Sequence, residues 1–242
     1  MYFQSTYLIS YLVLLHLAFA AVVVKSDTLP RLQGLLGIPT TAHPEFTDHH
    51  QNMRRYHTHV DGNVPDGAVL FFGDSITQGL ATAAITPNGV NFGIAGDSSF
   101  SLLDRLPKYA SVHRAGVIVI AVGNNDMNLR ENPATVANLH AVLAQVPEPI
   151  PVILNAVLPV DEPEREFTGG WNSKIADLND HLAAVAAESP RVHFVPPNPA
   201  YFDDENNLAD PLHNGDGIHL SPAGYAIWIA DLRVALAPLT AD

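Results

Sequence analysis

Cysteine is absent from the 242-residue chain, and this absence excludes two classes of chemistry. Without cysteine there is neither a disulfide framework nor a thiolate that could act as nucleophile or metal ligand. Basic residues are also scarce: 12 Lys and Arg stand against 25 Asp and Glu, so the formal net charge is −13. Such a surface repels phosphate backbones, and no nucleic-acid partner is expected. A chain of this length can bury one sizeable core.

Only the N-terminus carries a long apolar stretch. Residues 7–24 are apolar apart from one serine and one histidine, and Ala18-Phe19-Ala20 form a small-x-small pattern near the end. The pattern predicts a secretory signal peptide over residues 1–20, and therefore a secreted protein with no stable membrane association after cleavage. The first six residues lack Lys and Arg, which departs from that pattern. Two alternatives stay open, because the stretch is long enough for a membrane anchor and "YFQS" resembles the remainder of a cleavable tag.

Short apolar runs mark the strands. They are rich in β-branched residues and show no polar alternation, which is typical of parallel strands buried on both faces. A shorter strand is expected after the turn signal Pro87-Asn88-Gly89. The four runs cover 68–72, 117–122, 151–157 and 191–195, and the shorter strand covers 89–93.

Helices with recognisable starts alternate with these strands. Asn132 is predicted to be the N-cap and Pro133 the first residue of a helix that extends to about Val146, and Ser221-Pro222 begins the last helix. Apolar residues at helical spacing between 171 and 185 predict a helix with one face on the sheet. The alternation predicts an α/β fold: a doubly wound three-layer α/β/α sandwich with a mainly parallel five-stranded sheet, forming one domain over 66–242.

Residues 21–65 are expected to form an N-terminal arm, because they are rich in Pro, Gly and His and show no strong period. One helix is predicted within it, from about Phe46 to His59. The spacing of the histidines does not complete a tetrahedral site, so a solvated arm is favoured over a metal centre. The histidines concerned are His49, His50, His57 and His59.

Residue types that serve catalysis follow the apolar runs. Gly73-Asp74-Ser75 follows the first strand, 91–97 follows the short one, 123–126 follows the next, and 216–219 precedes the last helix. Open α/β sheets bind ligands beyond the carboxyl ends of their strands. The four segments are therefore expected to meet at one edge of the sheet.

Together these residues can perform acyl transfer. A serine hydroxyl such as that of Ser75 needs an adjacent base, commonly a histidine held by a carboxylate. Asp216 and His219 are three residues apart, so one turn can present both toward Ser75. Attack on an ester creates an oxyanion that needs donors. The amide N–H groups of Ser75 and Gly96 and the side-chain amide of Asn125 can supply them.

The segments "GDSIT" (73–77), "NFGIAGD" (91–97), "GNND" (123–126) and "DGIH" (216–219) resemble the four blocks of the SGNH hydrolases, also called GDSL esterases and lipases. The resemblance extends from about residue 68 to 236 and implies a flavodoxin-like sandwich without cofactor or metal. It departs mildly at Ile76, where many members have leucine, and in the Leu-Ser-Pro that follows the histidine. The roles it implies are Ser75 as nucleophile, Asp216 and His219 as its triad partners, and Gly96 and Asn125 as the remaining oxyanion-hole donors.

Other assignments are open around these blocks. Gly93 competes with Gly96 as the oxyanion donor, and the Gly-Asp pairing favours Gly96. Asp74 and Asp126 are expected to brace their loops rather than perform chemistry.

The favoured function is hydrolysis of carboxylic esters through an acyl-enzyme. Short acyl groups are expected, because no long apolar lid segment follows the leader. The alternatives are a carbohydrate O-deacetylase of the same mechanism and a catalytically silent binding protein. The expected substrate is a small-molecule or carbohydrate ester, with specificity set by the loops at 79–90, 127–132 and 158–170.

Overall fold

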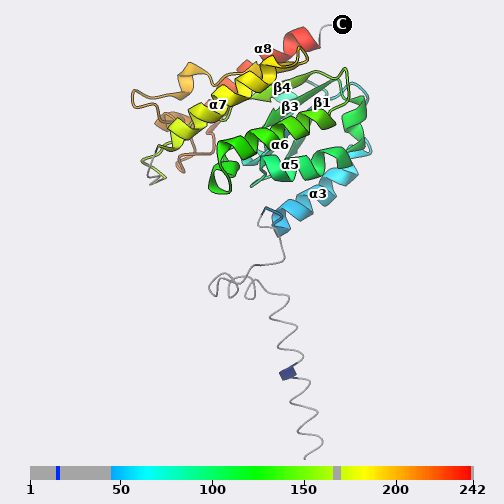
Figure 1. Cartoon of the computed structure of the whole chain (residues 1–242), viewed down its shortest axis with the longest axis horizontal. Helices are drawn as coiled ribbons and strands as arrows, with labels where there is room; N and C mark the ends of the chain where they lie inside the picture. Colours follow the sequence, from blue (N-terminus) through cyan, green and yellow to red (C-terminus); the bar gives the residue numbers. More distant parts are fainter. Residues whose placement is uncertain (1–14, 17–44, 166–169, 241–242) are drawn as a thin grey trace, which may run out of the picture. The chain divides into compact units, whose positions relative to one another are not determined.

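Five parallel strands form the predicted sheet in a computed structural model, which describes residues 15–16, 45–165 and 170–240. Their order is β2-β1-β3-β4-β5, and all neighbouring strands pair in parallel (Figure 1). The fold class predicted from the sequence is confirmed. The strands are β1 (Val69–Gly73), β2 (Gly89–Gly93), β3 (Val117–Ala121), β4 (Val152–Asn155) and β5 (Val192–Val195).

Both faces of the sheet are buried, which explains why its strands show no polar alternation. In β1, Leu70 and Phe72 join the apolar cluster on one face, and Val69 and Phe71 join the cluster on the other. The helices that contribute to the first cluster are α5 (Ser99–Arg105), α6 (Asn132–Gln145) and α7 (Trp171–Ala187), and the second receives α8 (Pro222–Leu236). Sheet and flanking helices thus make three layers.

The starts of α6, α7 and α8 agree with the sequence to within one residue. Ser221 caps α8, because its side chain accepts a hydrogen bond from the Gly224 amide. Helix α6 begins at Asn132, so its N-cap is Glu131 rather than the predicted Asn132. The short 3₁₀ segments are η1 (Thr82–Ala84), η2 (Leu106–Lys108), η3 (Ala110–Arg114), η4 (Asn125–Asn128), η5 (Pro199–Tyr201), η6 (Asp210–Leu212) and η7 (Ala237–Leu239).

Helix α3 (Asp48–Asp61) is the helix that the sequence placed in the arm, but it belongs to the compact unit Glu45–Asp242. His49 and His59 are exposed, as expected of a solvated segment. The same expectation is wrong for His50 and His57, which are buried. Each has a polar partner in the core: His50 pairs with Asp97, and His57 with the hydroxyl of Tyr109.

The predicted signal peptide and the part of the arm up to residue 44 lie outside the described residues, except residues 15 and 16. Among the helices that the structure describes, none combines the length and the apolar character needed to cross a membrane.

Candidate active site

Ser75 is the first residue of α4 (Ser75–Gln78), which follows β1 after a tight turn at Asp74. The Asp74 carboxylate caps this helix by accepting a hydrogen bond from the Ile76 amide at 3.0 Å. A side chain at Gly73 would collide with Thr77 and with the Ala121 carbonyl, so the turn requires glycine there. The backbone conformation at Ser75 is therefore fixed by β1 before it and by α4, which begins at it.

A continuous chain of hydrogen bonds connects Ser75, His219 and Asp216. His219 Nε2 lies 2.8 Å from Ser75 Oγ, and His219 Nδ1 lies 2.5 Å from Asp216 Oδ2. Because a carboxylate can only accept, Nδ1 carries the proton and Nε2 is free to accept from the serine hydroxyl. All three residues are half-buried, so the hydroxyl stays accessible to a substrate.

Asp216 also holds the backbone of its own turn. Its Oδ1 accepts the amide N–H groups of Ile218 at 2.9 Å and His219 at 2.8 Å. Burial alone would raise the pKa of Asp216, but the hydrogen bonds from the His219 side chain and from the two amides outweigh burial and hold the pKa below its ordinary value. Asp216 is therefore a carboxylate at neutral pH.

The three oxyanion-hole donors expected from the sequence come from separate segments. Gly96 has a φ of 80°, a left-handed conformation that favours glycine. In the described part of the chain no acceptor is bonded to the amide N–H of Ser75 or of Gly96. Asn125 donates one side-chain N–H to the Asp97 carbonyl at 2.9 Å, which leaves its second N–H available. The competing Gly93 amide is already bonded to Asn91 Oδ1 at 2.8 Å.

Asp126 ties two of these segments together. Its carboxylate accepts the Ser99 amide at 2.9 Å and the Ser99 hydroxyl, and it also pairs with Arg130. The loop after β3 is thereby fixed to the start of α5. Asp74 and Asp126 both have the bracing contacts that the sequence suggested.

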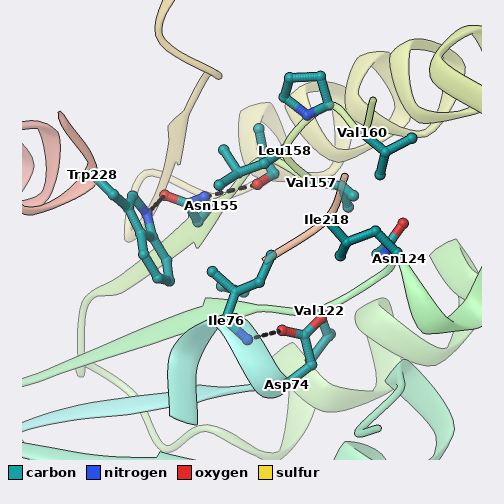
Figure 2. A pocket seen from close by; sticks show the side chains of 13 residues that line it. Asp74, Ile76, Val122, Asn124, Asn155, Val157, Leu158, Val160, Ile218 and Trp228 are labelled. Atoms are coloured by element: carbon teal, nitrogen blue, oxygen red, sulfur yellow. Dashed lines mark hydrogen bonds between the residues drawn. The ribbon is translucent and has the colours of Figure 1, made fainter. Parts of the chain in front are cut away.

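A small, mostly apolar pocket of about 30 Å³ lies at the carboxyl ends of β1, β3 and β4 (Figure 2). Ile76 and Ile218, the neighbours of Ser75 and His219, form part of its wall. Residues 158–160 line it too, from one of the loops expected to set specificity. At its far side Asn155 Oδ1 accepts the indole N–H of Trp228 at 3.0 Å. The polar atoms of that pair are satisfied, so the free surface of the pocket is largely apolar.

Sequence patterns did not single out His213, which supports the turn that carries Asp216 and His219. His213 is buried, and its Nδ1 accepts the amide N–H groups of Gly215 at 3.1 Å and Gly217 at 3.2 Å. Its Nε2 lies 3.3 Å from the Asp161 carboxylate, within ion-pair range but without hydrogen-bond alignment. The sequence hinted at this turn only through Gly215 and Gly217, two glycines that adopt positive φ angles in the structure.

Within the described ranges no cluster of three or more His, Cys, Asp or Glu side chains is arranged to hold a metal ion. The site as described is built from a hydroxyl, an imidazole, a carboxylate and amide donors.

The chain belongs to the GDSL-like lipase/acylhydrolase family, whose model matches residues 71–227. It is therefore a serine hydrolase that acts on ester bonds. This assignment sets aside the catalytically silent binding protein. No curated protein matches the chain.

Solved structures share this fold. A Streptococcus pneumonia protein provisionally described as a platelet activating factor superposes with a TM-score of 0.70 at 26% identity, covering 78% of this chain and 92% of its own. A GDSL-like lipase from Bacteroides thetaiotaomicron gives a TM-score of 0.64 at 26% identity, covering 77% and 98%. An acetyl xylan esterase has the same fold at 20% identity, with a TM-score of 0.59 and coverage of 70% and 99%.

Asp74 generates a pH-dependent prediction. Burial raises the pKa of its carboxyl from 3.8 to about 7, against the opposing hydrogen bond from Ile76. Between these values the folded chain binds more protons than the unfolded chain, so the contribution of Asp74 to stability falls as pH rises. Asp74→Asn keeps an N-cap oxygen but removes the charge. We expect the variant to gain stability relative to the parent between pH 4 and 7, by at most about 1.4 kcal/mol per pH unit.

The free energy of unfolding of both proteins, measured by denaturant titration across this range, checks the expectation. Asp204→Asn removes an exposed carboxylate and serves as the control, with no comparable trend. A constant difference between Asp74→Asn and the parent would show that Asp74 ionises normally.

Proposed function

We propose that the chain hydrolyses short-acyl carboxylic esters through an acyl-enzyme formed on Ser75, with His219 as base and Asp216 as its partner. The observation that carries the proposal is the pair of contacts on the His219 ring, 2.8 Å to Ser75 Oγ and 2.5 Å to Asp216 Oδ2. These distances fit a nucleophile, a base and a residue that orients the base.

In the proposed mechanism Ser75 Oγ attacks the ester carbonyl carbon while its proton moves to His219 Nε2. The tetrahedral intermediate then breaks its bond to the alcohol oxygen, which takes the proton from Nε2 as it leaves. A water molecule next attacks the acyl carbon and gives its proton to Nε2, and the intermediate expels Ser75 Oγ, which takes that proton back. Asp216 keeps the imidazole in the required tautomer and stabilises its charged form.

The oxyanion formed in both halves of the reaction needs donors that are already in place. The unbonded N–H groups of Ser75 and Gly96 and the free N–H of Asn125 are the proposed donors. The hydrogen bond from Asn125 to the Asp97 carbonyl supports this role, because it fixes the orientation of the amide before substrate arrives.

The pocket beside Ser75 supports a preference for short acyl groups. A volume of about 30 Å³ has room for only two or three water molecules, given that roughly 10–15 Å³ of such volume is the minimum for one. An acetyl methyl group is of that size, whereas a long chain is far larger. A carbohydrate deacetylase would use the same acyl group, so the two functions differ in the alcohol that leaves.

We also propose secretion, on the basis of the apolar N-terminal stretch alone. N-terminal sequencing of the mature protein recovered from the medium tests it. A new N-terminus near residue 21 is expected, and an intact leader on a membrane-bound protein would favour the anchor.

Asp216→Asn tests the triad. The amide can still accept the two backbone N–H groups, so the fold is retained, but it no longer enforces the His219 tautomer. We expect kcat to fall by orders of magnitude; the corresponding change costs about 10⁴-fold in a serine protease. Steady-state kinetics and a thermal melt check both parts.

Asp204→Asn is the matched control, because it removes an exposed carboxylate in the same way and should leave kcat unchanged. A kcat for Asp216→Asn within a few-fold of the parent, with the fold intact, would remove Asp216 from the triad.

Acyl-chain preference tests the pocket. We expect kcat/KM for p-nitrophenyl esters to be highest with acetate to butyrate and to fall toward palmitate. Ile218→Ala widens the pocket and should shift the preference toward longer chains, while Ile229→Ala on α8 should not. Faster hydrolysis of palmitate than of butyrate by the parent enzyme would contradict the proposal. A parallel panel of acetylated sugars separates the deacetylase from the esterase.

A further inference from the structure

Helix α3 precedes the residues that the family model matches, yet it reaches the core behind the active site. Its His50 Nε2 lies 3.2 Å from Asp97 Oδ1, and both side chains are almost completely buried. Because the carboxylate can only accept, Nε2 is the donor. A histidine 47 residues upstream thus contacts the residue next to Gly96.

Asp97 has all of its carboxylate contacts inside the protein. Oδ2 receives the Arg105 guanidinium at 2.8 Å from Nε and 2.6 Å from the second nitrogen. Among the residues that the structure describes, Oδ1 receives only His50 and the Ser101 hydroxyl. These bonds hold the pKa of Asp97 below its ordinary value despite complete burial, which by itself raises it. Removing His50 would leave Oδ1 with one donor in a site without water access, an energetically unfavourable state.

The main chain of Asp97 continues this network into the oxyanion hole. Its amide N–H bonds to the Ile94 carbonyl at 2.9 Å, which closes the turn that carries Gly96. Its carbonyl accepts the Asn125 side-chain N–H at 2.9 Å. The positions of two proposed oxyanion donors therefore both depend on where Asp97 lies.

We propose that His50 is a positioning residue for the oxyanion hole: by holding the Asp97 carboxylate, it fixes the Gly96 amide and the Asn125 side chain for the transition state. This inference rests on the proposed function of Gly96 and Asn125. His50 touches no substrate atom, so its effect appears in kcat and only through the two donors.

Three single variants test the positioning role. His50→Leu removes the donor, and we expect kcat to fall roughly 3- to 30-fold with KM little changed, the range expected when a residue acts through a packed network. His50→Gln keeps an N–H donor and should restore part of the loss; it also keeps the test valid if the leucine variant does not fold.

His57→Leu is the control from the same buried face of α3. Burial, assisted by Arg105, lowers the pKa of His57 to about 4, so the ring is neutral at assay pH. Its Nδ1 bonds to the Tyr109 hydroxyl at 3.0 Å, and it reaches Asp97 only indirectly, because that hydroxyl also accepts Arg105 at 3.3 Å. We expect this variant to lose stability with a clearly smaller loss in kcat than His50→Leu. Equal losses of kcat in His50→Leu and His57→Leu would show that α3 matters only for the fold.

A double-mutant cycle with Asn125→Ala identifies the route. Asn125→Ala alone should lower kcat by roughly 10²–10³-fold, as for an oxyanion-hole donor. If His50 acts through that donor, the His50→Leu effect shrinks in the Asn125→Ala background, because coupled residues are not additive. Full additivity, or an unchanged kcat in His50→Leu, overturns the positioning role. An unchanged kcat in Asn125→Ala instead overturns the proposed oxyanion hole, so the two failures are distinguishable.

Discussion

The buried ion pair between Asp97 and Arg105 is the interaction on which the active-site edge depends. Both side chains are completely excluded from solvent, and an unpaired charge at such a depth would be strongly destabilising. The pair is satisfied only when β1, the Gly96 turn and α5 meet: Arg105 comes from α5, and its guanidinium also reaches the Gly73 carbonyl at 3.4 Å. One electrostatic requirement therefore holds the end of β1 next to the Gly96 turn.

Further hydrogen bonds connect the Asp97–Arg105 pair to the other segments of the site. Asp97 presents its carbonyl to Asn125, and Asp126, the next residue along, binds the start of α5. Opposite them, His213 and Asp216 hold the turn that carries His219. Each side chain with a proposed role is thus held by hydrogen bonds that exist before substrate binds. Such preorganisation is how enzymes stabilise a transition state more than a ground state.

Much of the fold, and the placement of most residues of the candidate site, could be predicted from sequence. Strands buried on both faces appear as uninterrupted apolar runs such as 117–121, and parallel strands bring their carboxyl ends to one edge by geometry alone. The residues Ser75, Asp216 and His219 could be identified because each follows or precedes such an element in a short, compositionally distinctive segment. Local sequence patterns, together with the rule that ligands bind beyond the carboxyl ends of parallel strands, were sufficient to find these three residues.

The rest depended on partners far away in the chain. Helix α3 has a polar buried face, so hydrophobic periodicity gave no indication that His50 and His57 are interior; their partners lie 47 and 52 residues downstream. His213 was missed because its function is to accept two backbone amides, which leaves no motif. The size of the pocket depends on how Ile76, Ile218 and Trp228 from three segments pack together. Such properties exist only after folding.

Covalent labelling of Ser75 tests the central claim most directly. A serine-directed phosphonate should react with the full chain, and peptide mass spectrometry should locate the adduct on Ser75. Labelling should disappear in Ser75→Ala and slow greatly in Asp216→Asn. An adduct on another residue, or ester hydrolysis that persists in Ser75→Ala, would contradict the account.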